Sequence, residues 1–201
     1  MKFIKMQGAG NDYVYVDCFK EKVENPKKVA IKVSDRHFGI GSDGLILICP
    51  SDIADVRMDM YNADGSRGLM CGNGSRCVAK YAYDHGYVKK EKFTMETGAG
   101  IKHIEVEPLN GFAKYINVNM GRAKITSDFP EKISVNGKEE EFIGVDVGNP
   151  HAVYYVNTLE ELKSLDLTLI GRYYEKHERF PQGVNSEFIY VEDRKNIHMR
   201  V

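Results

Sequence analysis

The chain has 201 residues, which suits one large domain or two small ones, since a domain takes roughly 100–200 residues. Its 28 Lys and Arg balance 29 Asp and Glu to a net charge of −1, so no attraction to nucleic acid or anionic lipid is expected and a small-molecule partner is favoured. The longest apolar run, Leu45–Cys49, is far shorter than the roughly 18 residues of a membrane-spanning helix. No signal-peptide core follows Lys2 and Lys5, so a cytoplasmic location is expected.

Four cysteines occur without a Cys-x-x-Cys pair or regular spacing, which fits a reduced compartment better than a disulfide framework. Cys18, Cys49 and Cys77 are interpreted as small buried hydrophobic residues. Any functional cysteine is therefore expected to act as a thiol.

Strand and helix signals alternate along the first half of the chain. Asn25 and Pro26 are typical of a helix start, and this helix is expected to continue to about His37. A second helix is predicted from near Cys71 to a stop at Gly86. Strands are predicted over residues 3–6, 13–18, 45–49, 56–61, 91–97, 101–107 and 112–119, the last three forming a meander.

The second half repeats the order of the first. Residues 10–16 are echoed 138 positions later by residues 148–154, a Gly-Asn turn that leads into a Tyr- and Val-rich strand. The echo continues with a helix predicted over about 165–178, which matches the one that ends near His37, and with Phe180-x-x-Gly183, which matches Phe38-x-x-Gly41. The strand pattern at 188–190 then matches 45–47, and residues 197–201 match 56–60. These matches favour a duplicated half-domain. The expected domains are residues 1–119 and residues 120–201, the second without a counterpart of residues 62–86.

A glycine-rich string, Gly39-Ile-Gly-Ser-Asp-Gly44, matches the dinucleotide-binding pattern G-x-G-x-x-G. That pattern requires a strand before it and a helix after it, whereas here a helix precedes and a strand follows. The string is interpreted as a connection.

Cys71 stands at a predicted helix start and is followed by Gly72-Asn73-Gly74. Glycine within a helix costs roughly 1 kcal/mol relative to alanine, so two in one turn need a reason. One reason is close approach of an anionic ligand to the first amides, where the helix dipole also lowers a thiol pKa. Cys71 is thus a candidate base or nucleophile, with the Gly72 and Asn73 amides holding a carboxylate. An inert thiol at a glycine-softened helix start is the alternative.

Asparagines in turns offer neutral donors and acceptors that suit a zwitterionic substrate; alternatively, they only form the turns. His151 is a candidate for tuning a thiol; alternatively, it is a histidine at a strand end whose hydrogen bonds are satisfied within the fold. A metal site of Cys71, Cys77 and His85 is disfavoured, because the spacing fits no usual zinc motif.

Six blocks together resemble the diaminopimelate epimerase family: Met6–Tyr13, His37–Asp43, Tyr61–Ser66, Cys71-Gly-Asn-Gly-Ser-Arg-Cys77, Gly148–His151 and Phe180–Asn185. The resemblance implies an α/β fold of two similar domains, each with mixed and antiparallel strands wrapped around a central helix. It implies a cofactor-independent isomerase that interconverts LL- and meso-diaminopimelate, without a metal and with a homodimer as one expected assembly. Cys71 then falls on a catalytic position and His151 on one that influences the thiols. The substrate-binding positions are Asn11, Asn62, Gly72, Asn73, Asn149 and Asn185.

The chain departs from the family at two places. Family members usually have Gln where this chain has Gly44, and they continue into a segment with a second catalytic cysteine. Inverting an α-carbon requires one group to remove a proton and another to deliver one on the opposite face. The 201-residue form is therefore expected not to turn over. A related racemase for another amino acid, such as histidine, and a non-catalytic amino-acid-binding fragment remain alternatives.

Overall fold

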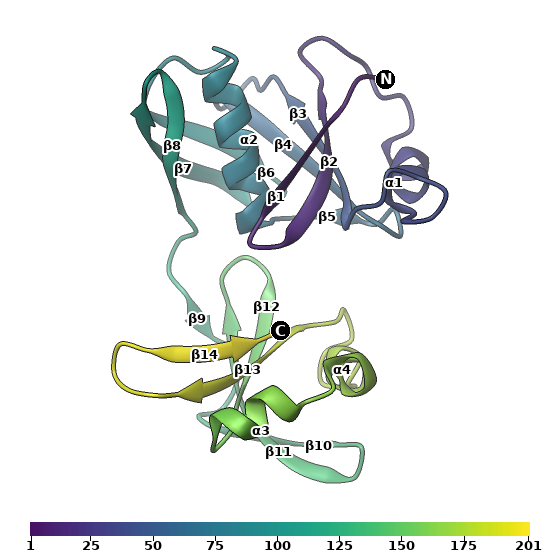
Figure 1. Ribbon diagram of the computed structural model, residues 1–201, viewed down its shortest axis with the longest axis vertical. Coiled ribbons are helices and arrows are strands. Elements are labelled where there is room, and N and C mark those ends of the chain that lie inside the picture. Colours follow the sequence, from purple (N-terminus) through teal and green to yellow (C-terminus); the bar gives the residue numbers. More distant parts are fainter. The chain divides into compact units, whose positions relative to one another are not determined.

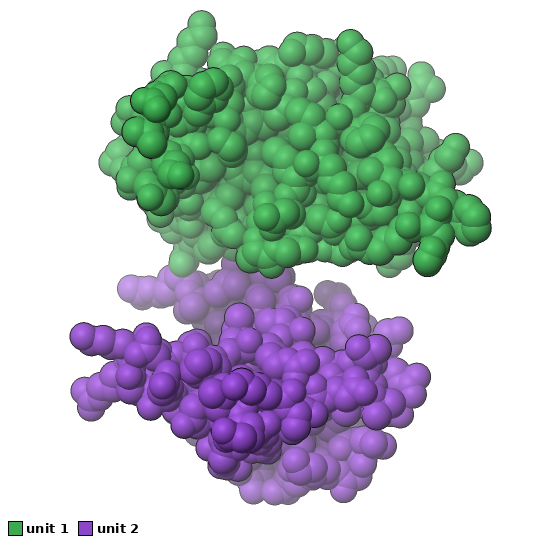
Figure 2. All heavy atoms as spheres, in the orientation of Figure 1, with its two compact units in different colours: residues 1–121 green, residues 122–201 purple.

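A computed structural model describes residues 1–201 as two compact units, residues 1–121 and residues 122–201 (Figure 2). Strands dominate both units, and each unit contains one mixed sheet with parallel and antiparallel neighbours. None of the helices combines the length and the apolarity needed to cross a membrane.

Unit 1 contains an eight-stranded sheet and two helices (Figure 1). Its elements are β1 (Ile4–Gly8), β2 (Asn11–Asp17), α1 (Pro26–Ser34), β3 (Gly44–Cys49), β4 (Val56–Asn62), β5 (Arg67–Gly68), α2 (Gly72–Asp84), β6 (Lys92–Thr97), β7 (Gly100–Leu109) and β8 (Phe112–Asn119). The strand order is β1-β2-β3-β4-β6-β7-β8, with β5 beside β4. The β2–β3 and β4–β6 pairs are parallel and the others are antiparallel.

The centre of this sheet is buried on both faces, because α1 covers one and α2 the other (Figure 1). Alternation along the strands sends successive side chains to opposite faces. Val14, Val16, Leu45 and Leu47 join the α1 cluster, and Tyr13, Tyr15, Ile46 and Ile48 join the α2 cluster. The β7–β8 hairpin adds Ile104, Val106 and Ala113 to the α2 cluster, so the sheet curls around α2.

Helix α1 begins as predicted but ends early. The Asn25 side chain accepts a hydrogen bond from the Lys28 amide at 3.2 Å, and Pro26 is the first helical residue. The helix ends at Ser34 rather than near His37, because the Asp35 carboxylate accepts from the amides of His37 and Phe38 and turns the chain. Residues 39–44 therefore lie between a helix and a strand, which confirms that the glycine-rich string lacks the dinucleotide-binding context.

Unit 2 contains a six-stranded sheet and two short helices. Its elements are β9 (Lys124–Ile125), β10 (Glu131–Val135), β11 (Lys138–Asp146), β12 (Pro150–Tyr155), α3 (Leu159–Ser164), α4 (Leu167–Glu175), β13 (Asn185–Val191) and β14 (Ile197–Arg200). The order is β10-β11-β12-β13-β14, with β9 beside β11. Both helices contribute to one core, through Leu162 of α3 and Tyr174 of α4, which pack with Phe142, Tyr154 and Phe188.

Two expectations for unit 2 were wrong or incomplete. The single helix expected over about 165–178 is α4 alone, preceded by a separate helix α3; Leu165 is extended between them, and the Asp166 side chain caps α4 by accepting from the Leu169 amide. The Arg200 guanidinium donates to the carbonyls of Leu162, Lys163 and Leu165, which stabilises the end of α3. The sequence pattern assigned no element to residues 120–147, yet they form β9, β10 and β11.

The strand pairing supports the duplication seen in the sequence. In unit 1, β1–β2 is antiparallel, β2–β3 parallel and β3–β4 antiparallel. In unit 2, β11–β12, β12–β13 and β13–β14 follow the same sequence of directions. The echoed segments thus occupy equivalent places, with β12 corresponding to β2 and β13 to β3.

Candidate active site

Cys71 is the N-cap of α2 and has extended backbone angles. Its sulfur accepts a hydrogen bond from the Gly74 amide at 3.2 Å, and its carbonyl accepts the first helical bond, from the Ser75 amide at 2.8 Å. The thiol therefore lies at the positive end of the helix dipole, beside amides that have no partner within the helix.

The two glycines of this turn serve different purposes. A Cβ at position 74 would lie 2.6 Å from Ile46 Cδ1, so the packing of α2 on β3 requires glycine there. A Cβ at position 72 would meet only Met120 at 3.6 Å, an ordinary contact. Packing thus explains Gly74 and leaves Gly72 as the position where a ligand can approach the backbone.

Asn11 and Asn62, two of the residues predicted in unit 1, lie at the end of the sheet where β2 and β3 begin and β4 ends. Asn11 begins β2, and Asn62 ends β4 opposite Gly44, the first residue of β3. Asn11 Oδ1 lies 3.2 Å from Cys71 Sγ, which joins the sheet edge to the helix start. The side-chain amide of Asn62 donates to Ser66 Oγ at 2.9 Å within the turn after β4.

Asn73 follows in the first turn of α2. Its side-chain oxygen accepts a hydrogen bond from Arg76 at 2.5 Å, so the carboxamide is occupied and the backbone amide is the group that can face a ligand. A Cβ on Gly8, at the end of β1, would lie 3.2 Å from Asn73 Cβ. The absence of that side chain lets β1 approach the helix start closely.

The acidity of Cys71 differs from the prediction. Burial raises the pKa of this thiol above the ordinary 9.0, and the hydrogen bonds from the Gly74 and Asn73 amides and from Tyr13 lower it only in part. The expectation that the helix start lowers this pKa was wrong, because desolvation outweighs the hydrogen bonds that reach the sulfur.

Two residues of this cluster were missed by the sequence analysis. Tyr13 is 5% exposed, and burial, reinforced by Cys71, raises its pKa. The repeat contained the signal: the 138-residue offset that pairs Asn11 with Asn149 also pairs Tyr13 with His151. Asp43 accepts a hydrogen bond from the Asn11 side-chain amide at 2.7 Å, a contact that no spacing in the sequence indicates.

The three residues predicted in unit 2 also lie together, at the end of the sheet where β12 and β13 begin. Asn149 immediately precedes β12, and His151 on β12 pairs with Asn185, the first residue of β13. The side-chain amide of Asn185 donates to the Pro150 carbonyl at 3.1 Å. Asn11 in unit 1 and His151 with Asn185 in unit 2 thus lie where the parallel pairs β2–β3 and β12–β13 begin.

His151 is held by a buried carboxylate. Its Nδ1 lies 2.5 Å from Glu187 Oε1, and its Nε2 lies 3.1 Å from Asn149 Oδ1. Glu187 is 8% exposed, and its second carboxylate oxygen is buried without a hydrogen-bond partner. Since a carboxylate only accepts, a neutral imidazole carries its proton on Nδ1 and is oriented by Glu187. The Nε2 of this neutral form then accepts from the side-chain nitrogen of Asn149, whose carboxamide is turned so that Nδ2 faces the ring.

Gly44 cannot be replaced by the family's Gln without rearrangement. A Cβ there would overlap with the Tyr61 carbonyl oxygen and would lie 2.8 Å from Tyr13 Cε1. The start of β3 and the end of β4 therefore pack too closely to admit any side chain at position 44.

The remaining cysteines belong to the cores of unit 1. Cys77 is part of the α2 core cluster, and Cys18 and Cys49 belong to the cluster under α1. His85 is at the opposite end of α2 from Cys71, about 20 Å away at 1.5 Å per residue, so these two side chains do not share a metal.

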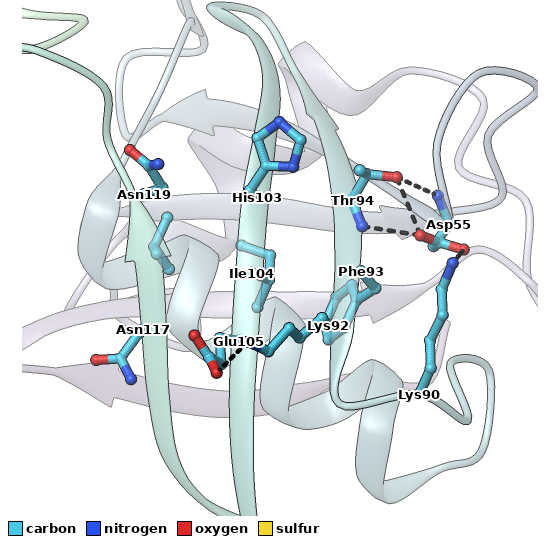
Figure 3. A pocket seen from close by; sticks show the side chains of 11 residues that line it. Asp55, Lys90, Lys92, Phe93, Thr94, His103, Ile104, Glu105, Asn117 and Asn119 are labelled. Atoms are coloured by element: carbon cyan, nitrogen blue, oxygen red, sulfur yellow. Dashed lines mark hydrogen bonds and ion pairs between the residues drawn. The ribbon is translucent and has the colours of Figure 1, made fainter.

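A hollow of the surface lies away from the predicted residues. It measures about 480 Å³ and lies over β6, β7 and β8 on the side turned away from α2 (Figure 3). Its charged groups are paired with one another, Lys90 with Asp55 at 2.9 Å and Lys92 with Glu105 at 2.9 Å. Because these charges are already neutralised, the hollow offers a ligand little electrostatic attraction.

The comparisons with known proteins agree with the fold and the motifs. The profile of the diaminopimelate epimerase family matches residues 3–126. A diaminopimelate epimerase from Acetivibrio thermocellus is 48% identical over 212 residues, covering 100% of this chain and 75% of that protein. One from Methanococcus maripaludis is 44% identical and is covered to 76%.

Solved structures with the same fold have diverged further in sequence. A hydroxyproline epimerase from Agrobacterium vitis superposes with a TM-score of 0.68 at 15% identity, over 98% of this chain and 68% of that one. A PhzF-family phenazine biosynthesis protein from Bacillus anthracis superposes with a TM-score of 0.65 at 18% identity, over 100% of this chain and 72% of that one. These likenesses show the fold, and the closer relatives and the profile show the family: the chain belongs to the diaminopimelate epimerase family.

Proposed function

We propose that the chain is a cofactor-independent amino-acid epimerase that interconverts LL- and meso-diaminopimelate by moving the α-proton. The observation that carries this is the position of Cys71, a thiol at a helix N-terminus with Asn11 at 3.2 Å and with the amides of the first turn beside it. The family and the names of the relatives at 44–48% identity support the substrate.

In this proposal Cys71 transfers a proton at the α-carbon. The amides of Gly72 and Asn73 bind the α-carboxylate, because the helix N-terminus favours negative charge and Gly72 leaves its backbone open. The same amides stabilise the charge that moves onto the carboxylate as the α-proton leaves. Asn11 and Asn62 line the substrate site in unit 1.

His151, Asn149 and Asn185 are the proposed functional residues of unit 2. Asn149 and Asn185 bind substrate through their carboxamides, and His151, oriented by Glu187, influences the catalytic thiols. The location is the cytoplasm, the assembly a homodimer and the ligand a small amino acid, without nucleic acid or membrane.

A second candidate has one observation in its favour. Because no side chain fits at Gly44, contacts that the family makes with Gln at this position are missing here. A related racemase for another amino acid, such as histidine, would retain Cys71, Gly72 and Asn73 while differing at such distal contacts.

A substrate panel separates these candidates. Each amino acid, LL-diaminopimelate, L-histidine and L-proline, is incubated with the protein in D2O, and loss of the α-proton signal is followed by NMR. The proposal expects exchange with diaminopimelate at the highest kcat/KM. Preferential exchange with another amino acid would establish the racemase instead. Binding of diaminopimelate by calorimetry without any exchange would indicate a non-catalytic binding protein.

A further inference from the structure

The Asn11 carboxamide is hydrogen-bonded on both sides. Its Nδ2 donates to Asp43 Oδ2 at 2.7 Å, and its Oδ1 lies 3.2 Å from Cys71 Sγ. An ionised carboxylate only accepts hydrogen bonds, so the amide nitrogen must face Asp43 and the carbonyl oxygen must face the sulfur. The usual ambiguity between the oxygen and nitrogen of an asparagine is thereby removed.

Asp43 is itself held in place by several donors. Its Oδ2 also accepts from the Asp12 amide at 3.0 Å, and its Oδ1 accepts from the Arg36 guanidinium at 2.9 Å. Arg36 donates in addition to Asp12 at 2.8 Å, and the Asp43 amide donates to the Asp12 carbonyl at 2.7 Å. The orientation imposed on Asn11 therefore comes from a fixed carboxylate.

An oxygen atom directed at the sulfur distinguishes the two forms of Cys71. The thiol can donate its proton to Asn11 Oδ1, whereas a thiolate would face a lone pair at the same place. The groups around the sulfur are the Gly74 and Asn73 amides and Cys77 on α2, Tyr13 on β2 and Asn11 with Asp43 behind it. Hydrogen bonds from the two amides and from Tyr13 favour the thiolate, whereas burial, the neighbouring Cys77 and the oxygen of Asn11 oppose it.

We propose that Asp43 is a positioning residue which, by orienting Asn11, keeps Cys71 in the protonated form, so that Cys71 meets the substrate as the proton donor. In the transfer, the S–H bond of Cys71 breaks and a C–H bond forms at the α-carbanion, leaving a thiolate. The statement about substrate rests on the proposed function, whereas the protonation state of Cys71 does not.

The test is the pH profile of Cys71 alkylation by iodoacetamide, read by mass spectrometry of the peptide that contains Cys71. In Asp43→Asn, the new carboxamide can accept from Asn11 or donate to it, so Asn11 can turn its amide toward the sulfur. The profile should then move to lower pH, with roughly tenfold faster alkylation at pH 7, the change that one pKa unit produces. The plateau rate at high pH should stay the same.

A double-mutant cycle separates positioning from a direct charge effect. Asn11→Ala alone should move the profile to lower pH, because the carbonyl oxygen is gone. Adding Asp43→Asn to Asn11→Ala should change nothing further, since Asp43 acts through Asn11. Asp55→Asn is the matched control in the same unit: this carboxylate accepts from the Thr94 amide at 2.8 Å and is remote from the network around Cys71.

Three results would overturn the inference: an unchanged profile in Asp43→Asn, a shift to higher pH, or a shift that persists in the Asn11→Ala background. Thermal melts of each variant show whether it is folded, and Asn11→Ala supplies a reading if Asp43→Asn is not. Since alkylation requires no substrate, the result is independent of whether diaminopimelate is the substrate.

Discussion

Cys71 Sγ lies 3.2 Å from Asn11 Oδ1, which joins the first turn of α2 to the first residue of β2 across 60 positions of sequence. This contact places the thiol at the edge of the sheet where β2 and β3 begin and β4 ends. The same edge carries Asn62 and the network around Asp43. The fold thus assembles the candidate site from loops and strand ends rather than from one contiguous motif.

Gly72 and Gly74 form a matched pair for mutation. Gly74→Ala should destabilise the protein by about 1–3 kcal/mol, because its methyl group would overlap with the fully buried Ile46. Gly72→Ala should leave stability within about 0.5 kcal/mol, because the space is open. Its expected effect is weaker diaminopimelate binding. Urea unfolding and calorimetry measure the two effects, and equal destabilisation by both substitutions would contradict the assignment.

Asp12 should contribute to stability at all but acidic pH. Its interactions with Arg36 and Lys5 lower its pKa from 3.8 to about 2 in the folded protein. A lowered folded pKa stabilises the protein above the unfolded value, and this contribution is lost as pH falls through the folded value. The difference in unfolding free energy between wild type and Asp12→Asn should be constant above about pH 4 and shrink between about pH 4 and pH 2. A difference that is independent of pH in this range would show that the charge of Asp12 is not involved.

His151 should carry its proton on Nδ1 when neutral. Glu187 Oε1 lies 2.5 Å from that nitrogen, and a carboxylate can only accept there. Nitrogen-15 NMR of the imidazole distinguishes the two tautomers. The Nδ1–H form should dominate in wild type and be lost in Glu187→Leu, while Glu192→Leu, which removes the exposed partner of His198, should leave His151 unaffected. Finding the Nε2–H form in wild type would exclude the proposed orientation.

Cys18 and Cys49 should cross-link under oxidation. They follow the in-register pair Asp17–Ile48 on parallel strands, belong to one cluster, and share a hydrogen bond that raises the pKa of Cys18 and lowers that of Cys49. Neighbouring strands lie about 4.8 Å apart, within the Cα spacing of a disulfide. Hydrogen peroxide takes two electrons and two protons from the thiols and becomes water. Mass spectrometry should find a Cys18–Cys49 peptide, absent in Cys18→Ser; linkage only to Cys77 would refute the pairing.

Much of the fold could be predicted because local chemistry determines it. Asn25 and Pro26 set the start of α1, Gly86 with φ +72° ends α2, and Asn110-Gly111 joins β7 to β8. The end of α1 could not be predicted, because the Asp35 carboxylate accepts hydrogen bonds from the His37 and Phe38 amides and so turns the chain there. Strands β10 and β11 were missed because each begins with consecutive charged residues, Glu131-Lys132 in β10 and Lys138–Glu141 in β11, which hide the period-two pattern. Only their tertiary pairing identifies them as strands.

The site could be predicted in part for a similar reason. Cys71 stood out because two glycines follow it, and the structure explains one of them by the packing of Ile46. Asp43 acts through a contact that bridges 32 positions, and the effect of burial on the Cys71 pKa depends on the whole core. Neither is written in a local pattern.

The central claim is that Cys71 moves the α-proton of an amino acid. Among the cysteines of residues 1–201, Cys71 is the one that lies at a helix N-terminus. In D2O with LL-diaminopimelate, the protein should introduce deuterium at the α-carbon, because the thiolate form of Cys71 takes the α-proton and the deuterated thiol returns deuterium. Cys71→Ala should abolish this exchange, while Cys77→Ala retains it. Deuterium uptake that is unaffected by Cys71→Ala, or no uptake in the wild-type chain, would contradict the account.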